Sequence, residues 1–236
     1  MQFKNIKLLF STILIIIITS SLQAQSSFSL SAGGDIVSRY IWRGLEINGT
    51  LNIQPTVEAT YGGLTAGLWG SYAFAERGST NELDFYAGYT ISTESAGDFG
   101  LLFTDYYFTT GHKLSDVSDT SAHFLEAAVT YSGPSSIPIS IFLAYTFKPA
   151  SVKSLYWEVG YSTSIDAFGF DIFVGGTDGG AAEYYGSTEF AVITTGFKAS
   201  QDITLGESLQ MPLSVSFILN PKQETVYLVF GVGLKI

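Results

Sequence analysis

Residues 64–74 read Leu-Thr-Ala-Gly-Leu-Trp-Gly-Ser-Tyr-Ala-Phe, an alternation of apolar residues with small or polar ones. Successive side chains of a β-strand point to opposite faces, so the pattern places Leu64, Leu68 and Phe74 on one apolar face. The segment is about as long as a tilted strand that crosses an outer membrane. The same alternation recurs almost from end to end of the chain, and it predicts an all-β protein.

Turn residues divide the alternating pattern into strands. We expect about twelve of them, at residues 28–43, 51–61, 64–74, 81–92, 98–108, 123–131, 139–147, 154–165, 168–175, 188–199, 210–219 and 224–236. An even number places both termini on the periplasmic side of an outer membrane, as in bacterial single-chain barrels.

The lengths of the connections support this orientation. The long connections 109–122 and 176–187 follow odd-numbered strands, and tight turns at 62–63 and 166–167 follow even-numbered ones. Barrels of this class carry long loops outside the cell and short turns in the periplasm. Two connections are exceptions: 200–209 is long where a short turn is expected, and 220–223 is short where a long loop is expected.

The composition decides between a soluble and a membrane barrel. Hydrophobic residues make up 46% of the chain and charged residues only 14%, yet no apolar run after residue 24 is long enough for a membrane helix. A closed antiparallel transmembrane β-barrel accounts for both observations, because an open sheet edge in lipid would leave backbone groups unpaired. Twelve strands give a backbone diameter of roughly 24 Å and a lumen on the order of 10 Å. A soluble β-sandwich is the alternative, although one sandwich needs fewer strands.

The first residues have the features of a secretory signal peptide. Lys4 and Lys7 precede a short apolar run from Leu8 to Ile18, and small residues then allow cleavage after Ala24. We expect a signal peptide at 1–24, one barrel domain at 25–236 and a location in the bacterial outer membrane. An uncleaved anchor is the alternative, although the run is short for one.

Charge and cysteine content exclude several classes of function. Loss of the two leader lysines lowers the formal charge from −10 to −12, which argues against nucleic acid as a partner. The chain has no cysteine, so it has no disulfide and no thiolate chemistry. We expect no cofactor and no metal site; the expected partners are outer-membrane lipids, the barrel-assembly machinery and small solutes or ions.

The stretch Ser-Arg-Tyr-Ile-Trp-Arg-Gly at 38–44 holds two of the three arginines, at the end of the first expected strand. Charge in a membrane strand is costly unless it points away from lipid. The alternation therefore turns Arg39 and Arg43 towards the lumen and Tyr40 and Trp42 towards the lipid. We expect an aromatic girdle at the membrane interface made of Tyr40, Trp42, Tyr72, Tyr89, Tyr145 and Trp157.

Five carboxylates have the same inward phase as these arginines: Glu58, Glu82, Asp84, Glu126 and Glu158. They lead to the hypothesis of a charged constriction, in which the carboxylates meet Arg39 and Arg43 and select small solutes or ions. The alternative is that these ion pairs only brace a closed barrel, because a buried charge needs a partner whatever its role. Asp105 is an anomaly, since it is in phase with the lipid-facing Phe103; a bulge or a place in the headgroup zone would explain it.

An enzymatic role is the weaker alternative. Some outer-membrane barrels of this size are lipid hydrolases with a Ser–His pair on the outer surface. Here the two histidines, His112 and His123, flank the long connection 109–122, near the candidate nucleophiles Ser115 and Ser118 and the candidate orienting groups Asp116 and Asp119. A polar surface loop is the simpler interpretation, so no enzyme activity is expected.

Several motifs in order along the chain resemble one family. The motif at 38–44 looks like the Ser-x-Tyr-x-x-Arg-Gly motif of the TorF-like porins, also known as the Gcw-type conserved hypothetical outer-membrane proteins. The likeness continues through Gln54-Pro55, residues 63–71 and residues 82–89, and more loosely to residue 165. The resemblance implies an outer-membrane barrel with a porin role and no catalytic residues, although this chain ends in Ile236 where such barrels commonly end in an aromatic residue.

Overall fold

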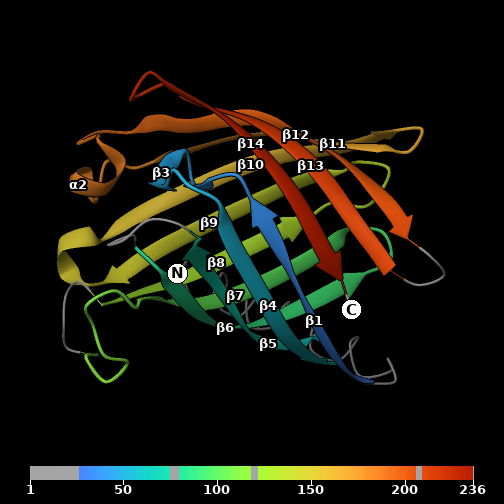
Figure 1. Ribbon diagram of the computed structural model, residues 1–236, viewed down its shortest axis with the longest axis horizontal. Helices are drawn as coiled ribbons and strands as arrows, with labels where there is room; N and C mark the ends of the chain where they lie inside the picture. The colour runs from blue at the N-terminus through green and yellow to red at the C-terminus, as the bar shows by residue number, and fades with distance from the viewer. Residues whose placement is uncertain (1–26, 75–79, 118–121, 206–208, 236) are drawn as a thin grey trace, which may run out of the picture.

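The computed structural model describes residues 27–74, 80–117, 122–205 and 209–235. They form a closed antiparallel barrel of twelve strands, in the order β1-β14-β13-β12-β11-β10-β9-β8-β7-β6-β5-β4 and back to β1 (Figure 1). The prediction of an all-β, closed antiparallel barrel of twelve strands is therefore confirmed. The signal peptide expected at 1–24 lies outside the described residues.

The barrel strands cover most of the chain. Their bounds are β1 (Phe28–Val37), β4 (Asn52–Tyr61), β5 (Leu64–Ala73), β6 (Glu82–Thr93), β7 (Gly97–Phe108), β8 (His123–Ser132), β9 (Ile139–Lys148), β10 (Ser154–Ile165), β11 (Phe168–Thr177), β12 (Ala191–Leu205), β13 (Leu209–Asn220) and β14 (Thr225–Lys235). A one-turn helix, α2 (Ala182–Tyr185), and a short 3₁₀ turn, η1 (Ala150–Val152), lie in two connections. No helix in the described part of the chain is long and apolar enough to span a membrane.

Two strand ends differ from the prediction by more than three residues. The first barrel strand ends at Val37, and the residues after it form a separate hairpin of β2 (Tyr40–Trp42) and β3 (Leu45–Asn48). The prediction of a long connection at 200–209 is wrong, because β12 continues to Leu205 and pairs with β13 as far as the Leu205–Leu209 pair. This exception to the pattern of loop lengths therefore disappears, whereas the short connection between Asn220 and Thr225 at the loop end remains.

The two ends of the barrel differ. At the turn end the strands are joined by the short connections 62–63, 94–96, 133–138, 166–167 and 206–208. Gly62 and Asp166 take left-handed backbone conformations, with φ of 59° and 54°, as tight turns require. At the loop end four connections, 38–51, 74–81, 109–122 and 178–190, are longer, whereas 149–153 and 221–224 are short. Figure 1 shows β3 and α2 together at this end.

The outer face of the barrel is apolar. Large side chains such as Leu64, Leu101, Ile172 and Phe230 leave more than half of their surface exposed. Tyr72, Tyr89 and Tyr145 of the expected girdle also point outwards and are exposed by 38, 41 and 45%. Trp157 is half-buried, and its ring stacks on Phe190 of the 178–190 loop.

The barrel interior is filled at one end only. Leu45 of the hairpin, Tyr185 of α2, and Tyr156 and Ile193 of the wall form a buried cluster at the loop end. Towards the turn end, a cavity of about 460 Å³ lies among Glu58, Asp84, Tyr86 and Tyr106. We call it the turn-end cavity.

Candidate functional site

A hairpin folded into the barrel forms the centre of the candidate site. The chain leaves the wall at Val37 and returns at Asn52, and these two residues are paired neighbours in the sheet. The turn of the hairpin is Arg43–Gly44, and both residues have positive φ, 50° and 77°. A Cβ on Gly44 would lie 2.2 Å from the Ile193 carbonyl oxygen, so only glycine fits between the turn and the wall.

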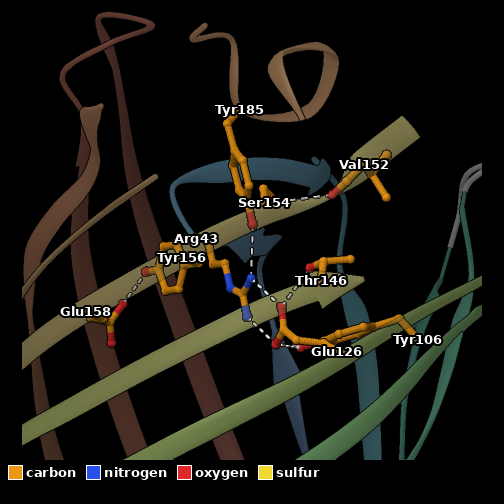
Figure 2. A network of polar contacts seen from close by, with 9 residues as sticks. All are labelled: Arg43, Tyr106, Glu126, Thr146, Val152, Ser154, Tyr156, Glu158 and Tyr185. Carbon is orange, nitrogen blue, oxygen red and sulfur yellow. Dashed lines mark hydrogen bonds and ion pairs between the residues drawn. The ribbon is translucent and has the colours of Figure 1, made fainter. Parts of the chain in front are cut away.

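The turn places Arg43 against the opposite wall. Its Nη1 and Nη2 donate to Glu126 Oε2 and Oε1 at 2.8 and 2.6 Å, a two-pronged pair. The two side chains are only 7% and 2% exposed. Nη1 also donates to the Tyr185 hydroxyl at 3.0 Å, which joins α2 to the same guanidinium (Figure 2).

Further contacts complete the surroundings of this ion pair. Glu126 also accepts hydrogen bonds from Tyr106 at 2.9 Å and from Thr146 at 3.0 Å. The guanidinium carbon of Arg43 lies 4.3 Å from the centre of the Trp42 ring and 4.2 Å from that of Tyr156. A buried ion pair stabilises only when its geometry is good and its remaining atoms are bonded, and both conditions hold here.

The hairpin is attached to three separate parts of the chain. Glu126 comes from β8, Tyr185 comes from α2, and Asn220 at the end of β13 donates from its side-chain amide to the Gly44 carbonyl oxygen at 3.1 Å. These attachments hold the hairpin across the lumen, and we call residues 38–51 the plug.

Tyr40 and Trp42 do not lie on the outer face, contrary to the prediction. Tyr40 is 6% exposed and its ring lies 5.5 Å from Trp69 inside the barrel. Trp42 stacks on Tyr185, with ring centres 6.0 Å apart. Because the wall ends at Val37, the alternation continues in a strand that faces the lumen on both sides.

The two predicted arginines have different partners. Arg39 pairs with Glu46 on the plug itself, at 2.8 Å, and both side chains are about one-third exposed. The expected ring of carboxylates around both arginines is therefore not formed, because only Arg43 reaches a wall carboxylate. Glu58 and Glu158 instead accept from Tyr86 at 3.0 Å and from Tyr156 at 2.5 Å.

Glu82 and Asp84 form a second buried acidic site. They point inwards from neighbouring positions on the same face of β6 and are 2% and 6% exposed. Glu82 interacts with Asp84 and with the Tyr40 hydroxyl. In the described part of the chain no basic side chain forms an ion pair with either carboxylate.

These two carboxylates line different cavities. Glu82 lines a small pocket at the loop end, with about 30 Å³ of open space between Tyr40, Trp42, Tyr106 and Tyr184. Asp84 lines the turn-end cavity, and Tyr106 lines both spaces. We call the smaller space the loop-end pocket.

The anomalous Asp105 has a partner on the outer face of the barrel. The pairing of β6 with β7 runs through Asp105 without a bulge, and the Asp105 carboxylate lies 2.9 Å from Nδ1 of His123. The other ring nitrogen of His123 lies 3.2 Å from the Leu114 carbonyl oxygen, and the Tyr107 ring stacks on the imidazole. The pair therefore attaches the 109–117 part of the loop to the wall.

The contacts of His123 do not form the serine–histidine arrangement considered for a hydrolase. The partners of His123 within the described residues are Asp105, Leu114 and Tyr107, none of which is a serine. Asp116 accepts from the Lys113 backbone in a local turn, and Ser118 and Asp119 lie outside the described residues. The same described residues contain no group of three or more acidic or histidine side chains that could hold a metal ion.

Some of the residues around Arg43 were not among the sequence candidates. Tyr106 and Thr146 have the inward phase of their strands, so the alternation could have included them. Tyr185 lies in a one-turn helix within a long loop, and no periodicity marks it.

Comparison with protein families gives a match over most of the chain. The model of a family described as a bacterial protein of unknown function (Gcw_chp) matches residues 21–208. No curated protein matches the chain significantly. The family description names no activity, so the function has to be inferred from the barrel itself.

Proposed function

The chain belongs to the Gcw_chp family of bacterial proteins, and we propose that it is an outer-membrane channel for ions or small solutes, closed at its loop end by the plug. The observation that carries this proposal is the division of the lumen. The loop end is filled by the plug around Arg43, whereas the turn end contains the cavity of about 460 Å³.

The outer face supports a location in the outer membrane. Soluble monomers rarely expose such extended apolar surface, whereas transmembrane barrels show an apolar band flanked by aromatic residues. The signal peptide expected at 1–24, the periplasmic termini and assembly by the barrel-assembly machinery belong to this proposal. A closer relationship with the TorF-like porins is also part of this proposal.

The lumen charges favour cations. The carboxylates of Glu58 and Asp84 line the turn-end cavity and that of Glu82 lines the loop-end pocket, while the buried Arg43 is neutralised by Glu126. An excess of one charge sign in a narrow, low-dielectric passage raises the local concentration of the opposite ion.

Conductance in planar lipid bilayers tests the proposal. We expect the wild type to open rarely and Arg43→Ala to open often, because the variant frees the plug from Glu126. Arg39→Ala is the matched control: it removes the same charge from the same plug, but Arg39 pairs with Glu46 of the plug and forms no ion pair with the wall. Heat-modifiable migration on a detergent gel verifies that each variant folds.

A non-conducting structural barrel is the second candidate. The three attachments of the plug favour it, because a plug that never moves needs no release. Absence of discrete openings in the wild type, in Arg43→Ala and in a Tyr185→Phe/Asn220→Ala double variant, all folded, would establish this candidate and reject the channel.

We assign no catalytic role to His123. His123 has both ring nitrogens engaged and is 3% exposed, so it is not accessible to a lipid ester. Mass spectrometry of phospholipid incubated with the protein should show no product. A product that disappears in His123→Ala would contradict this assignment.

A further inference from the structure

Two buried carboxylates on β6 lack the compensation that Glu126 has. Glu126 receives two bonds from Arg43 and one each from Tyr106 and Thr146. Asp84 is equally close to full burial, yet its Oδ1 is buried and has no hydrogen-bond partner. An ionised carboxylate in such a place costs several kcal/mol unless a cation or a proton neutralises it.

The location of the pair shows how a neutralising group could reach it. Glu82 opens onto the loop-end pocket and Asp84 onto the turn-end cavity, and Tyr106 lies at the boundary of both. The pair thus lies between two spaces on the β6 side of the lumen. Arg43 and its attachments block the side of β8 and β10.

We infer that Glu82 and Asp84 bind a small monovalent cation, which enters from the turn-end cavity and passes the plug along β6. The inference rests on the proposed channel for the passage, whereas the binding itself can be tested separately. It identifies the transported ion class and a route along β6 that opens when the plug is released from Glu126.

Size and ligand number select a monovalent cation over other ligands. The loop-end pocket has about 30 Å³, room for about two water-sized particles, so an ion must shed most of its hydration shell to occupy it. Carboxylate and hydroxyl oxygens are hard ligands that suit alkali cations, and Tyr40 adds a hydroxyl beside Glu82. Among the described residues the site offers two carboxylates and one hydroxyl, fewer than the about six to eight oxygen ligands that Ca²⁺ takes, which disfavours a divalent ion.

The first test locates the ion. Crystals of the full protein are grown with rubidium chloride as the only alkali salt, and anomalous diffraction locates the rubidium. We expect a peak in contact with Asp84 Oδ1, lost in Asp84→Asn and retained in Glu158→Gln. Glu158 is the matched control, because it is also a lumen carboxylate but lines neither space and already has the Tyr156 hydroxyl.

The second test concerns a proton as the competing occupant. Infrared spectra of the folded protein show whether a protonated carboxyl group is present. A wild-type protein without a rubidium peak at Asp84, and with a protonated-acid band that disappears in Asp84→Asn, would overturn the inference. Rubidium bound only elsewhere would also overturn it.

The outcomes separate this inference from the proposed function. If rubidium binds at Asp84 but the protein never conducts, the proposed channel is rejected and the proposed cation site stands. A channel whose Arg43→Ala variant conducts, but in which no rubidium binds Asp84, rejects the site and leaves the channel. A conducting wild type should also lose cation preference in Asp84→Asn, and an unchanged reversal potential contradicts the route.

Discussion

Two acidic sites lie inside the same barrel and are neutralised in different ways. Glu126 is bonded to Arg43, Tyr106 and Thr146, all provided by the chain. Glu82 and Asp84 are as deeply buried, but within the described residues they have no basic partner. The first site therefore holds the plug against the wall, whereas the second has the properties of a ligand-binding site. Burial and charge alone do not distinguish them; the origin of the compensating charge does.

The largest expected effect contrasts the buried ion pair with the exposed one. Arg43→Ala leaves Glu126 charged and unpaired in the interior, and we expect a loss of about 3–5 kcal/mol of unfolding free energy. Arg39→Ala removes a pair that is one-third exposed, and we expect a loss of about 0–1 kcal/mol. Guanidinium titration in detergent micelles measures both. Equal losses would mean that the plug is not fastened at Glu126.

A smaller effect is expected from the plug turn. Gly44→Ala places a Cβ 2.2 Å from the Ile193 carbonyl oxygen at a residue with positive φ. We expect a loss of about 1–3 kcal/mol, since the turn must shift and strain its backbone. Rubidium binding at Asp84 should remain, because the turn does not contact that site. Loss of both stability and binding would show that the two sites are coupled.

The smallest effect concerns the uncompensated pair. If a cation neutralises Asp84, potassium should stabilise the wild type relative to a salt of a large organic cation. The gain is about 1.4 kcal/mol when potassium is tenfold above its dissociation constant. Thermal unfolding in the two salts measures it, and Asp84→Asn should remove the difference while Glu158→Gln retains it. A wild type that responds equally to both salts would contradict cation binding.

The barrel could be predicted from the sequence because each wall strand has one apolar and one polar face. The same local pattern could not predict the plug. Tyr40 and Trp42 continue the phase of the outward Ile36, so nothing in the alternation marks the departure at Val37. The inward direction depends on Glu126, Tyr185 and Asn220, which are far away in the sequence.

The candidate site was predicted in part for the same reason. The inward phase of Glu82, Asp84 and Glu126 follows from their strands, and their burial agrees with it. Which carboxylate meets Arg43 depends on the path of the plug across the lumen.

The 200–205 end of β12 was not predicted, because the polar residues Gln201 and Asp202 are typical of a loop, although both lie in β12.

The plug also has a property that follows from its two ends. Val37 and Asn52 are paired neighbours in the wall, so the 38–51 segment is a short loop tied at both ends to one place. Release of Arg43 from Glu126 therefore does not let the plug diffuse away, and reattachment is an intramolecular event. For so short a tether the effective concentration is at least millimolar. We expect open periods to be brief and their duration to be set by this tether, so a longer 38–51 loop should prolong them.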